Sequence, residues 1–577
     1  MSSVSDIRPL PKLALGLALM FAALAAATAA DKPKAPVSQG NSRASQIDAA
    51  FKEWDTSTTP GASVAVIDKG KVVFAKGYGI ANLEYGIPIK PETIFHVASV
   101  SKQFTAMAIV LLQSDGKLSL DDDVHKYLPE LPDYGKKITI RNLLQHTSGV
   151  RDQWQTLALA GWDIEDVITQ DQILRMTFRQ KELNFPPGSR FLYSNAGFTL
   201  LAEIVARVSG EKFPQFCNER IFAPLQMTHT HFHQDLTQIV RDRAYSYSQR
   251  ENGYAIAPLN YANAGATSLF TTATDLVKWL DNFRTLKVGG AAALAEMQER
   301  GVLTDGNKID YGLGVFLGSF RGLQTVYHGG ADAGNRSDVH WFPAQQLGVA
   351  VVSNLASFNP DELAKRVAEI YLADQMTPAE AKPAAPESTA FAADPKDLGK
   401  YAGVYPFPKI DQDLKIVAQE DKLWLAADGN ARLELHPVGP AHFYLKELKA
   451  DIVFIPKGSD GMSIKVTQGT EINEGDRLPP ADAAVAADLS AYAGTYWSDE
   501  LETQYTFSVK DGKLFALHNH HGEFELTPTL RDHFSSGQWY ASKAHFVRDA
   551  KGKVISVVLG GGRITGVTFV RKPDGSR

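Results

Sequence analysis

The C-terminal third of the chain contains the same sequence pattern twice. Residues 397–405 (DLGKYAGVY) match 488–496 (DLSAYAGTY), an offset of 91 residues (397 to 488) that later segments keep. Short runs of alternating apolar and polar residues follow in both copies, separated by turn residues, as is typical of antiparallel strands. Such a sheet removes its exposed edges by closing on itself. The repeat therefore predicts two small all-β barrels, over residues 393–482 and 483–577.

Residues 1–30 have the pattern of a secretory signal peptide. Arg8 and Lys12 precede an Ala-rich apolar run at 13–27, and Ala27-Thr28-Ala29 has the small-x-small form of a cleavage site. The run is short for a membrane span, so an uncleaved anchor is the less favoured alternative. We expect a bacterial protein that is periplasmic or secreted, with no membrane attachment after cleavage.

Composition excludes several classes of partner and site. A chain of 577 residues is too long for one hydrophobic core and predicts several domains. The net charge of −6 gives no reason to expect nucleic acid or an anionic membrane as a partner. The single cysteine, Cys217, rules out an intrachain disulfide and any multi-cysteine metal site. It lies in an apolar helical pattern, which predicts a packing role.

Ser99 and Lys102 form a Ser-x-x-Lys pattern at the head of an apolar run to Leu112. If a helix begins at Ser99, Lys102 lies one turn later on the same face, beside the positive end of the helix dipole. A partly desolvated amine there accepts the hydroxyl proton, and nearby amide N–H groups face a developing oxyanion. The same pattern occurs at Ser114 and Ser209, so by itself it indicates only a helix start.

The region 31–374 has strand patterns at both ends and helical patterns between them. Two β-rich runs, 61–68 and 71–78, form a hairpin signal near the beginning, and further strand-like runs lie between 315 and 353. This order predicts an α+β domain in which one antiparallel sheet is packed by helices. An Ala- and Pro-rich segment at 375–392 is the expected linker to the barrels.

Three motifs give this region a family resemblance. Ser99-Val100-Ser101-Lys102, Tyr193-Ser194-Asn195 and His328-Gly329-Gly330 occur in the order and spacing of the penicillin-recognising serine hydrolases. The chain resembles the group that holds class C β-lactamases, D-alanyl-D-alanine carboxypeptidases, related esterases and D-aminopeptidases. Flanking stretches such as His146-Thr147-Ser148-Gly149 are similar too. The resemblance covers about residues 45–372 and implies a β-lactamase/transpeptidase-like fold.

The resemblance implies catalytic roles for four residues. Ser99 attacks a carbonyl carbon and becomes acylated, with Lys102 and Tyr193 as the proton-transfer pair. Which of these two is the acylation base stays open. His328 stands where many relatives carry lysine, and a histidine near its reference pKa is charged only in part at neutral pH. This departure disfavours an efficient β-lactamase without excluding one.

Four further residues are implied to bind the substrate. Asn195 offers an amide donor and acceptor for a substrate amide. Gly330 lets the strand edge approach the substrate closely, and the backbone N–H groups of Ser99 and Ala331 form the oxyanion hole. Arg336 is either an anchor for a carboxylate or a surface arginine.

A catalytic domain followed by two barrels resembles the bacterial D-aminopeptidases of this family. In those enzymes a loop of the last barrel reaches the active site and restricts the substrate. The segment 518–522 (HNHHG) is the candidate loop here. On a strand, His518 and His520 share a face, and a metal site is the alternative interpretation of this pair. No further ligand stands at a matching spacing, so we favour a polar loop tip.

We therefore expect an exported serine hydrolase that cleaves small peptides, amides or esters through an acyl-enzyme on Ser99. A D-aminopeptidase or a D-alanyl-D-alanine carboxypeptidase-like peptidase is the favoured type, acting on cell-wall fragments or β-lactams among other compounds. No cofactor and no metal is expected. A class C-like β-lactamase or a carboxylesterase is the alternative within the same chemistry. A non-catalytic protein that binds peptides or cell-wall fragments is the alternative of another class, and the sequence does not indicate an oligomeric state.

Overall fold

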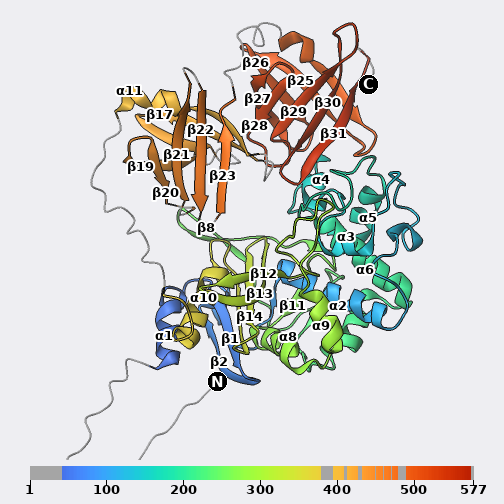
Figure 1. Cartoon of the computed structure of the whole chain (residues 1–577), viewed down its shortest axis with the longest axis vertical. Coiled ribbons are helices and arrows are strands. Elements are labelled where there is room, and N and C mark those ends of the chain that lie inside the picture. Colours follow the sequence, from blue (N-terminus) through green and yellow to red (C-terminus); the bar gives the residue numbers. More distant parts are fainter. Residues whose placement is uncertain are drawn as a thin grey trace, which may run out of the picture.

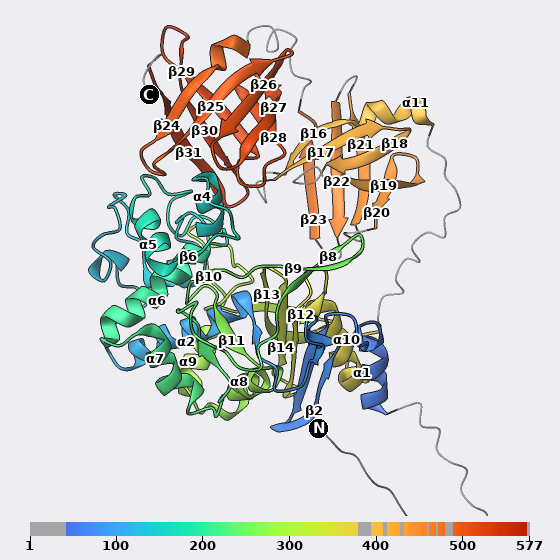
Figure 2. The same ribbon diagram turned by 180° about the vertical axis from the view of Figure 1, so that it is seen from behind.

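The computed structural model shows three bodies, a helix-rich domain and two β-barrels (Figures 1 and 2). It describes residues 42–378, 394–407, 412–426, 432–446, 448, 450–458, 461–468, 471–478 and 489–573. The predicted signal peptide at 1–30 and most of the predicted linker at 375–392 lie outside these residues.

The first domain is built on a six-stranded antiparallel sheet in the order β12-β13-β14-β15-β1-β2. Its strands are β1 (Ala62–Asp68), β2 (Lys71–Tyr78), β12 (Phe316–Phe320), β13 (Leu323–Asp332), β14 (Asn335–Phe342) and β15 (Leu347–Ser353). β1 pairs with β15 from Ala62↔Ser353 to Asp68↔Leu347, which joins the N-terminal hairpin to the C-terminal strands. The predicted sheet, made from both ends of the domain, is confirmed.

Helices cover both faces of this sheet. Because successive side chains of a strand point to opposite faces, Val64 and Val66 pack with α1 (Arg43–Phe51) and α10 (Pro360–Leu372), while Ala65 and Ile67 face the larger helical layer. That layer contains α2 (Ser101–Ser114), α3 (Ile140–Leu144), α5 (Gln170–Phe178), α6 (Asn195–Ser209), α7 (Phe213–Cys217), α8 (Ala273–Thr285) and α9 (Gly290–Met297). Cys217 is buried in α7, as its predicted packing role requires.

The central helix begins two residues later than predicted. A 3₁₀ turn over Ala98–Val100 precedes α2, and Ala98 adopts a φ of +47°. The helix that follows is buried around its whole circumference, as expected of a helix at the centre of a domain. Ser99 therefore lies in the turn that enters α2, between the sheet and the helical layer.

Both barrels follow the repeat. The first is an eight-stranded sheet of β16 (Gly403–Phe407), β17 (Gln412–Gln419), β18 (Lys422–Ala426), β19 (Arg432–Gly439), β20 (His442–Leu445), β21 (Ala450–Lys457), β22 (Gly461–Gln468) and β23 (Glu471–Asp476). The second is closed and consists of β24 (Gly494–Ser498), β25 (Thr503–Lys510), β26 (Lys513–His518), β27 (Gly522–Leu530), β28 (His533–Ser536), β29 (Lys543–Arg548), β30 (Val554–Gly561) and β31 (Ile564–Arg571). A buried tyrosine repeats at the same offset: Tyr405 donates to the carbonyl of Tyr401 at 2.8 Å, and Tyr496 to that of Tyr492 at 2.9 Å.

The second barrel docks on α4 (Gln153–Leu159) of the first domain, and Figures 1 and 2 agree on this placement. Ala158 and Leu159 belong to the apolar core of the barrel. The hydroxyl of Tyr505 donates to the carbonyl oxygen of Leu159 at 3.0 Å. The end of α4 thus completes the barrel core, and its beginning, at Asp152, binds Asn195 at the start of α6.

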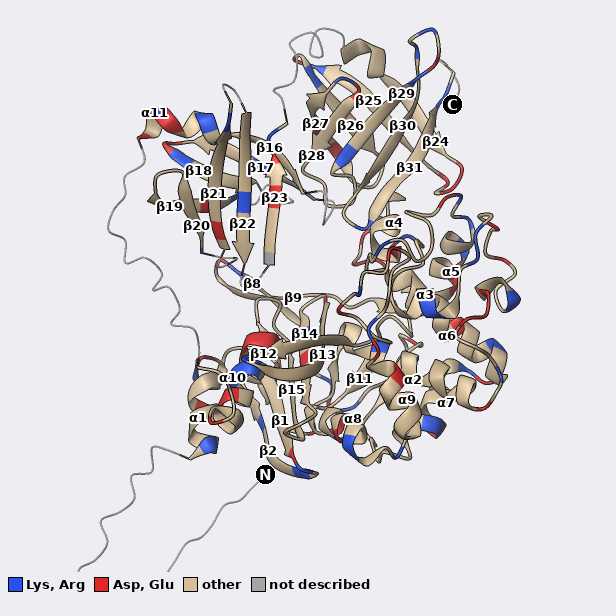
Figure 3. Ribbon diagram, in the orientation of Figure 1, with Lys and Arg blue, Asp and Glu red and all other residues tan. Residues whose placement is uncertain are grey.

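Charged side chains of both signs are interspersed along all three bodies (Figure 3). This distribution agrees with the small net charge of the chain. Of the helices that the structure describes, none combines the length and the apolar character needed to cross a bilayer.

Candidate active site

Ser99 lies in the turn before α2, facing the open edge of β13. β12 pairs with β13 only as far as Tyr327, so the edge of β13 beyond that residue is free to approach the turn. A Cβ built on Gly330 would lie 2.4 Å from the Val97 carbonyl oxygen and 3.0 Å from the Ser99 nitrogen. Only glycine permits this approach, which brings the β13 backbone alongside Ser99.

The amine of Lys102 is fully buried beside Ser99. Its Nζ lies 3.1 Å from Ser99 Oγ, 2.8 Å from Asn195 Oδ1 and 2.7 Å from the Ala266 carbonyl oxygen. Burial lowers the pKa of Lys102 to about 7, against the opposing effects of Asp332 and Asp152. A neutral amine has two N–H groups, which match the two amide oxygens, and its lone pair then faces Ser99.

Asn195 links Lys102 to Asp152. Its Oδ1 accepts from Lys102, while its Nδ2 and backbone N–H donate to Asp152 Oδ2 at 2.7 and 2.9 Å. Asp152 is the N-cap of α4 and also accepts from the backbone N–H groups of Trp154 and Gln155. The amide of Asn195, expected to hold a substrate amide, is therefore engaged at both ends by the protein, where it orients Lys102.

Tyr193 lies against both Lys102 and His146. Lys102 Nζ is 4.8 Å from the centroid of the Tyr193 ring, and the His146 ring lies 4.0 Å away on a tilt of 30°. The buried Tyr193 hydroxyl has no hydrogen-bond partner of good geometry among the described residues. Burial raises the pKa of Tyr193, and the nearby Ser99 side chain opposes this effect. Tyr193 is thus a neutral phenol next to the nucleophile.

A chain of hydrogen bonds fixes both histidines of the site as neutral. The Ser194 N–H donates to His146 Nδ1 (3.1 Å), so His146 Nε2–H donates to the Tyr311 oxygen (3.3 Å). The Tyr311 hydroxyl in turn donates to His328 Nε2 (3.0 Å), and His328 Nδ1–H donates to the Gly329 carbonyl (2.7 Å). Burial lowers the pKa of His328 to about 3 and that of His146 well below its usual value. The expectation of a partly charged His328 is therefore wrong.

Arg336 and Ala331 lie opposite each other in the β13–β14 register. Nη1 of Arg336 donates to the carbonyls of Ala333 (3.0 Å) and Asn335 (2.7 Å) in the same hairpin. Burial lowers the pKa of Arg336, and the nearby Asp332 opposes this effect. The arginine is partly buried near the site, with at least part of its guanidinium used to hold its own turn.

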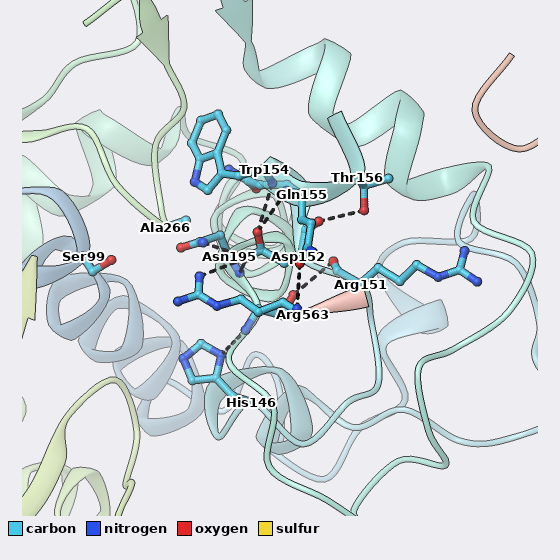
Figure 4. A network of polar contacts seen from close by, with 12 residues as sticks. Ser99, His146, Arg151, Asp152, Trp154, Gln155, Thr156, Asn195, Ala266 and Arg563 are labelled. Atoms are coloured by element: carbon cyan, nitrogen blue, oxygen red, sulfur yellow. Dashed lines mark hydrogen bonds and ion pairs between the residues drawn. The ribbon is translucent and has the colours of Figure 1, made fainter. Parts of the chain in front are cut away.

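The second barrel places Arg563 in this site. In Figure 4 the guanidinium of Arg563 lies between Asn195 and His146 and points toward the side on which Ser99 lies. Its Cζ is 4.9 Å from the centroid of the Tyr193 ring, and Nη1 is 3.7 Å from Asp152 Oδ2.

The turn between β30 and β31 that carries Arg563 is held by two residues of the first domain. The N–H of Arg563 donates to Gln155 Oε1 at 2.6 Å, and Asn184 Nδ2 donates to the Arg563 carbonyl at 2.9 Å. Gln155 Nε2 also donates to the carbonyl oxygens of Gly561 and Trp539. The position of the turn is therefore set by both domains.

The segment 518–522, expected to reach the active site, does not do so. His520 Nδ1 contacts the carbonyl oxygen of Gly161 (3.0 Å) and His521 Nε2 that of Ala158 (2.7 Å), at the far end of α4. His518 contacts Thr503 Oγ1 at 2.7 Å. These histidines join the barrel to α4, and the turn with Arg563 enters the site instead.

Sequence reasoning missed four groups of the site: Asp152, the Ala266 carbonyl, Tyr311 and Arg563. One of them has a signal in the sequence. Arg563 follows Gly560-Gly561-Gly562, and a run of three glycines at a hairpin end indicates a close backbone approach. The others come from loops without a distinctive local pattern.

Comparisons with known proteins give matches over the first domain and beyond it. The family model described as Beta-lactamase matches residues 47–374. A D-aminopeptidase of Brucella anthropi is 28% identical over 524 residues, which cover 87% of this chain and 93% of that protein. Penicillin-binding protein 4* of Bacillus subtilis is 27% identical over 416 residues, 68% of this chain and 89% of that protein.

A solved structure supports the fold. The octameric penicillin-binding protein homologue from Pyrococcus abyssi superimposes with a TM-score of 0.54 at 23% identity. The match covers 83% of this chain and 98% of that chain, so it extends beyond the first domain.

Proposed function

Because this chain belongs to the beta-lactamase family and is a serine hydrolase, we propose that it is an exported peptidase that cleaves small peptides or amides containing D-residues. The observation that carries this proposal is the buried Lys102 amine, 3.1 Å from Ser99 Oγ with a pKa lowered to about 7. The name of one relative, a D-aminopeptidase, supports substrates of the D-amino acid class.

In the proposed acylation step, Ser99 Oγ attacks the carbonyl carbon of the substrate and neutral Lys102 takes the hydroxyl proton. The raised pKa of Tyr193 disfavours its phenolate, so Lys102 is the better base. Tyr193 then carries the proton toward the leaving nitrogen. The N–H groups of Ser99 and Ala331 stabilise the oxyanion, and the close approach at Gly330 supports their convergence.

Water then completes the proposed cycle. The leaving amine departs with the proton, and the acyl group stays on Ser99 until a water molecule attacks the ester carbonyl. Lys102 takes a proton from this water, and Ser99 regains its hydroxyl proton as the acid is released. The described residues supply every group that these steps use.

A labelling experiment with a substrate panel tests this function. The mature protein is treated with a fluorophosphonate and assayed on D- and L-alanine p-nitroanilide, a D-Ala-D-Ala peptide, a short-chain p-nitrophenyl ester and nitrocefin, each beside Ser99→Ala. We expect labelling of Ser99 and hydrolysis of D-amide or D-peptide substrates, both lost in Ser99→Ala. Turnover of the ester or of nitrocefin alone would instead identify an esterase or a β-lactamase, and an unlabelled Ser99 would identify a binding protein.

Export is proposed from the sequence pattern of residues 1–30. Expression of the full chain in a Gram-negative host, followed by fractionation and N-terminal sequencing, tests it. We expect a mature chain in the periplasm that begins near residue 30. A cytoplasmic protein that keeps Met1 would contradict the proposal.

A further inference from the structure

The strand motif next to Ser99 offers no positive charge at neutral pH. Both ring nitrogens of His328 are already used, one as donor to Gly329 and one as acceptor from Tyr311. If His328 Nε2 were protonated, the buried Tyr311 hydroxyl would lie between two N–H groups, those of His328 and His146. Its own proton would then have no acceptor at either histidine. An anionic group of a substrate must therefore find a different partner.

Arg563 provides such a charge. Its backbone is fixed by Gln155 and Asn184, and its guanidinium rests on the face of the Tyr193 ring at 4.9 Å. The side chain as a whole is 47% exposed. In Figure 4 its guanidinium points toward the side of Ser99.

Asp152 does not occupy the hydrogen-bond donors of the Arg563 guanidinium. Its Oδ2 already accepts two hydrogen bonds from Asn195, and its Oδ1 accepts from the backbone N–H groups of Trp154 and Gln155. At 3.7 Å the contact with Arg563 is an ion pair without a hydrogen bond. Within the described part of the chain, Asp152 is the only carboxylate within 4.0 Å of Arg563. Donors of the guanidinium therefore remain for a ligand.

We propose that Arg563 binds a carboxylate of the substrate, so that the enzyme selects anionic peptides or amides. This inference rests on the proposed hydrolytic function in one respect, that the bound carboxylate belongs to a substrate. The anion site itself is built from contacts that need no turnover. A guanidinium matches a carboxylate through paired hydrogen bonds.

Matched substrate pairs test this proposal. One pair is acetyl-D-alanyl-D-alanine and its C-terminal amide, with the carboxylate on the leaving group. The other is succinyl-D-alanine p-nitroanilide and acetyl-D-alanine p-nitroanilide, with the carboxylate on the acyl side. Each is assayed with the wild type, Arg563→Gln, Arg563→Lys and the control Arg531→Gln, which removes an exposed arginine of the same barrel.

We expect Arg563→Gln to lower kcat/KM about 10- to 100-fold for the anionic member of one pair. At pH 8.5, above the midpoint set by Lys102 near pH 7, the neutral member should change less than about 3-fold. Arg563→Lys should keep part of the preference, and Arg531→Gln should match the wild type. The pair that responds identifies the side of the scissile bond on which the carboxylate lies. An equal loss for anionic and neutral substrates, or no loss for either, would overturn the proposal.

Equilibrium binding tests the same site without catalysis. By calorimetry, the wild type should bind N-acetyl-D-alanine at least about 10-fold more tightly than N-acetyl-D-alanine amide, and Arg563→Gln should bind the two alike. Selective binding without labelling of Ser99 would refute the hydrolytic function and keep the carboxylate site. Labelling of Ser99 together with equal binding of the acid and the amide would keep the hydrolytic function and refute the carboxylate site.

Discussion

Lys102 is a buried lysine whose pKa is lowered toward neutrality by its surroundings. The negative charges that face it are Asp332 and Asp152, and the positive charge is Arg563 of the second barrel. Burial outweighs the two carboxylates and brings its pKa to about 7. The lysine can therefore exchange a proton near neutral pH.

This state of Lys102 predicts the pH dependence of activity. On a neutral substrate, kcat/KM should rise tenfold per pH unit below about pH 7 and level off above it, because only neutral Lys102 accepts the Ser99 proton. In Arg563→Gln the midpoint should move to higher pH, since the cation that lowers the pKa of Lys102 is gone. A pH profile of kcat/KM measures both effects, and Arg531→Gln should keep the midpoint of the wild type. A profile that is flat from pH 5.5 to 8.5 would contradict the assignment.

His340 is a second buried residue with a displaced pKa, here without a role in catalysis. Its Nε2 lies 2.9 Å from an oxygen of Asp338 and 3.1 Å from one of Asp361. Thr325 donates to the Trp341 carbonyl, so the Thr325 oxygen accepts from His340 Nδ1–H. Both ring nitrogens therefore carry protons. Although burial opposes it, the two carboxylates raise the pKa of His340 to about 9.

The charged His340 should stabilise the fold in a defined pH range. Because the folded pKa of about 9 lies above the unfolded value, its contribution is complete below about pH 6.5 and is lost as the pH rises through 9. His340→Gln should therefore lower the free energy of unfolding more at pH 6 than at pH 9.5, as measured by urea denaturation. A matched control is His533→Gln, whose pKa is lowered by burial and should not show this loss at low pH. An equal loss at both pH values would refute the charged form.

At the scale of elements, α4 connects the nucleophile to the second barrel. Asp152 at its N-terminus binds Asn195, which orients Lys102, and Leu159 at its C-terminus lies in the barrel core. Between them, Gln155 binds the turn that carries Arg563. The short helix α4 thus helps to position both Lys102, the base, and Arg563, the cation of the site.

Gln155→Ala should loosen that turn while leaving the nucleophile in place. The change removes hydrogen bonds to the Arg563 N–H and to two carbonyls of the barrel, each worth about 1 kcal/mol. We expect kcat/KM to fall for the carboxylate-bearing substrates that respond to Arg563 and to stay near the wild-type value for their neutral partners. Thr529→Ala, at a solvent-exposed hydrogen bond of the same barrel, is the control. A parallel loss on neutral substrates would mean that α4 itself had moved.

The sequence predicted elements that depend on local signals. The β1–β2 hairpin and the barrel repeat appear where expected, and α6 ends before Gly210, which has a φ of +77°. Prediction from the sequence failed where residues distant in the chain determine the charge or the position of a side chain. The charge of His328 depends on burial and on Tyr311, and the entry of Arg563 depends on a contact with Gln155 across 408 residues. The glycines at 560–562 indicate a close backbone approach, but no local pattern identifies the distant residue that is approached.

At the scale of the molecule, a buried ion pair joins the first domain to the second barrel. Arg151 pairs with Glu500 through Nη1 and donates to the Gly566 carbonyl through Nη2 at 2.7 Å. The two side chains are 3% and 6% exposed. A buried charge without its partner is costly, so the pair holds the two bodies in one arrangement.

Removal of one partner should destabilise the whole assembly. Glu500→Ala leaves the Arg151 guanidinium buried and unpaired, and we expect a loss of about 3–5 kcal/mol in the free energy of unfolding. Asp499→Ala removes the neighbouring pair with Lys181, whose side chains are 73% and 60% exposed, and should cost less than about 1 kcal/mol. Denaturant titration compares the two. Equal effects would show that the buried pair does not hold the interface.

The long separation between Gln155 and Arg563 also sets an order of events during protein synthesis. The ribosome completes Ser99, Lys102 and Tyr193 hundreds of residues before it reaches the turn that docks on Gln155. A nascent first domain therefore holds its nucleophile while it lacks the cation that lowers the pKa of Lys102. The unfinished chain lacks this contribution to the lowered pKa of Lys102, and it also lacks the guanidinium proposed to bind a carboxylate. It acquires both when its last barrel folds onto α4.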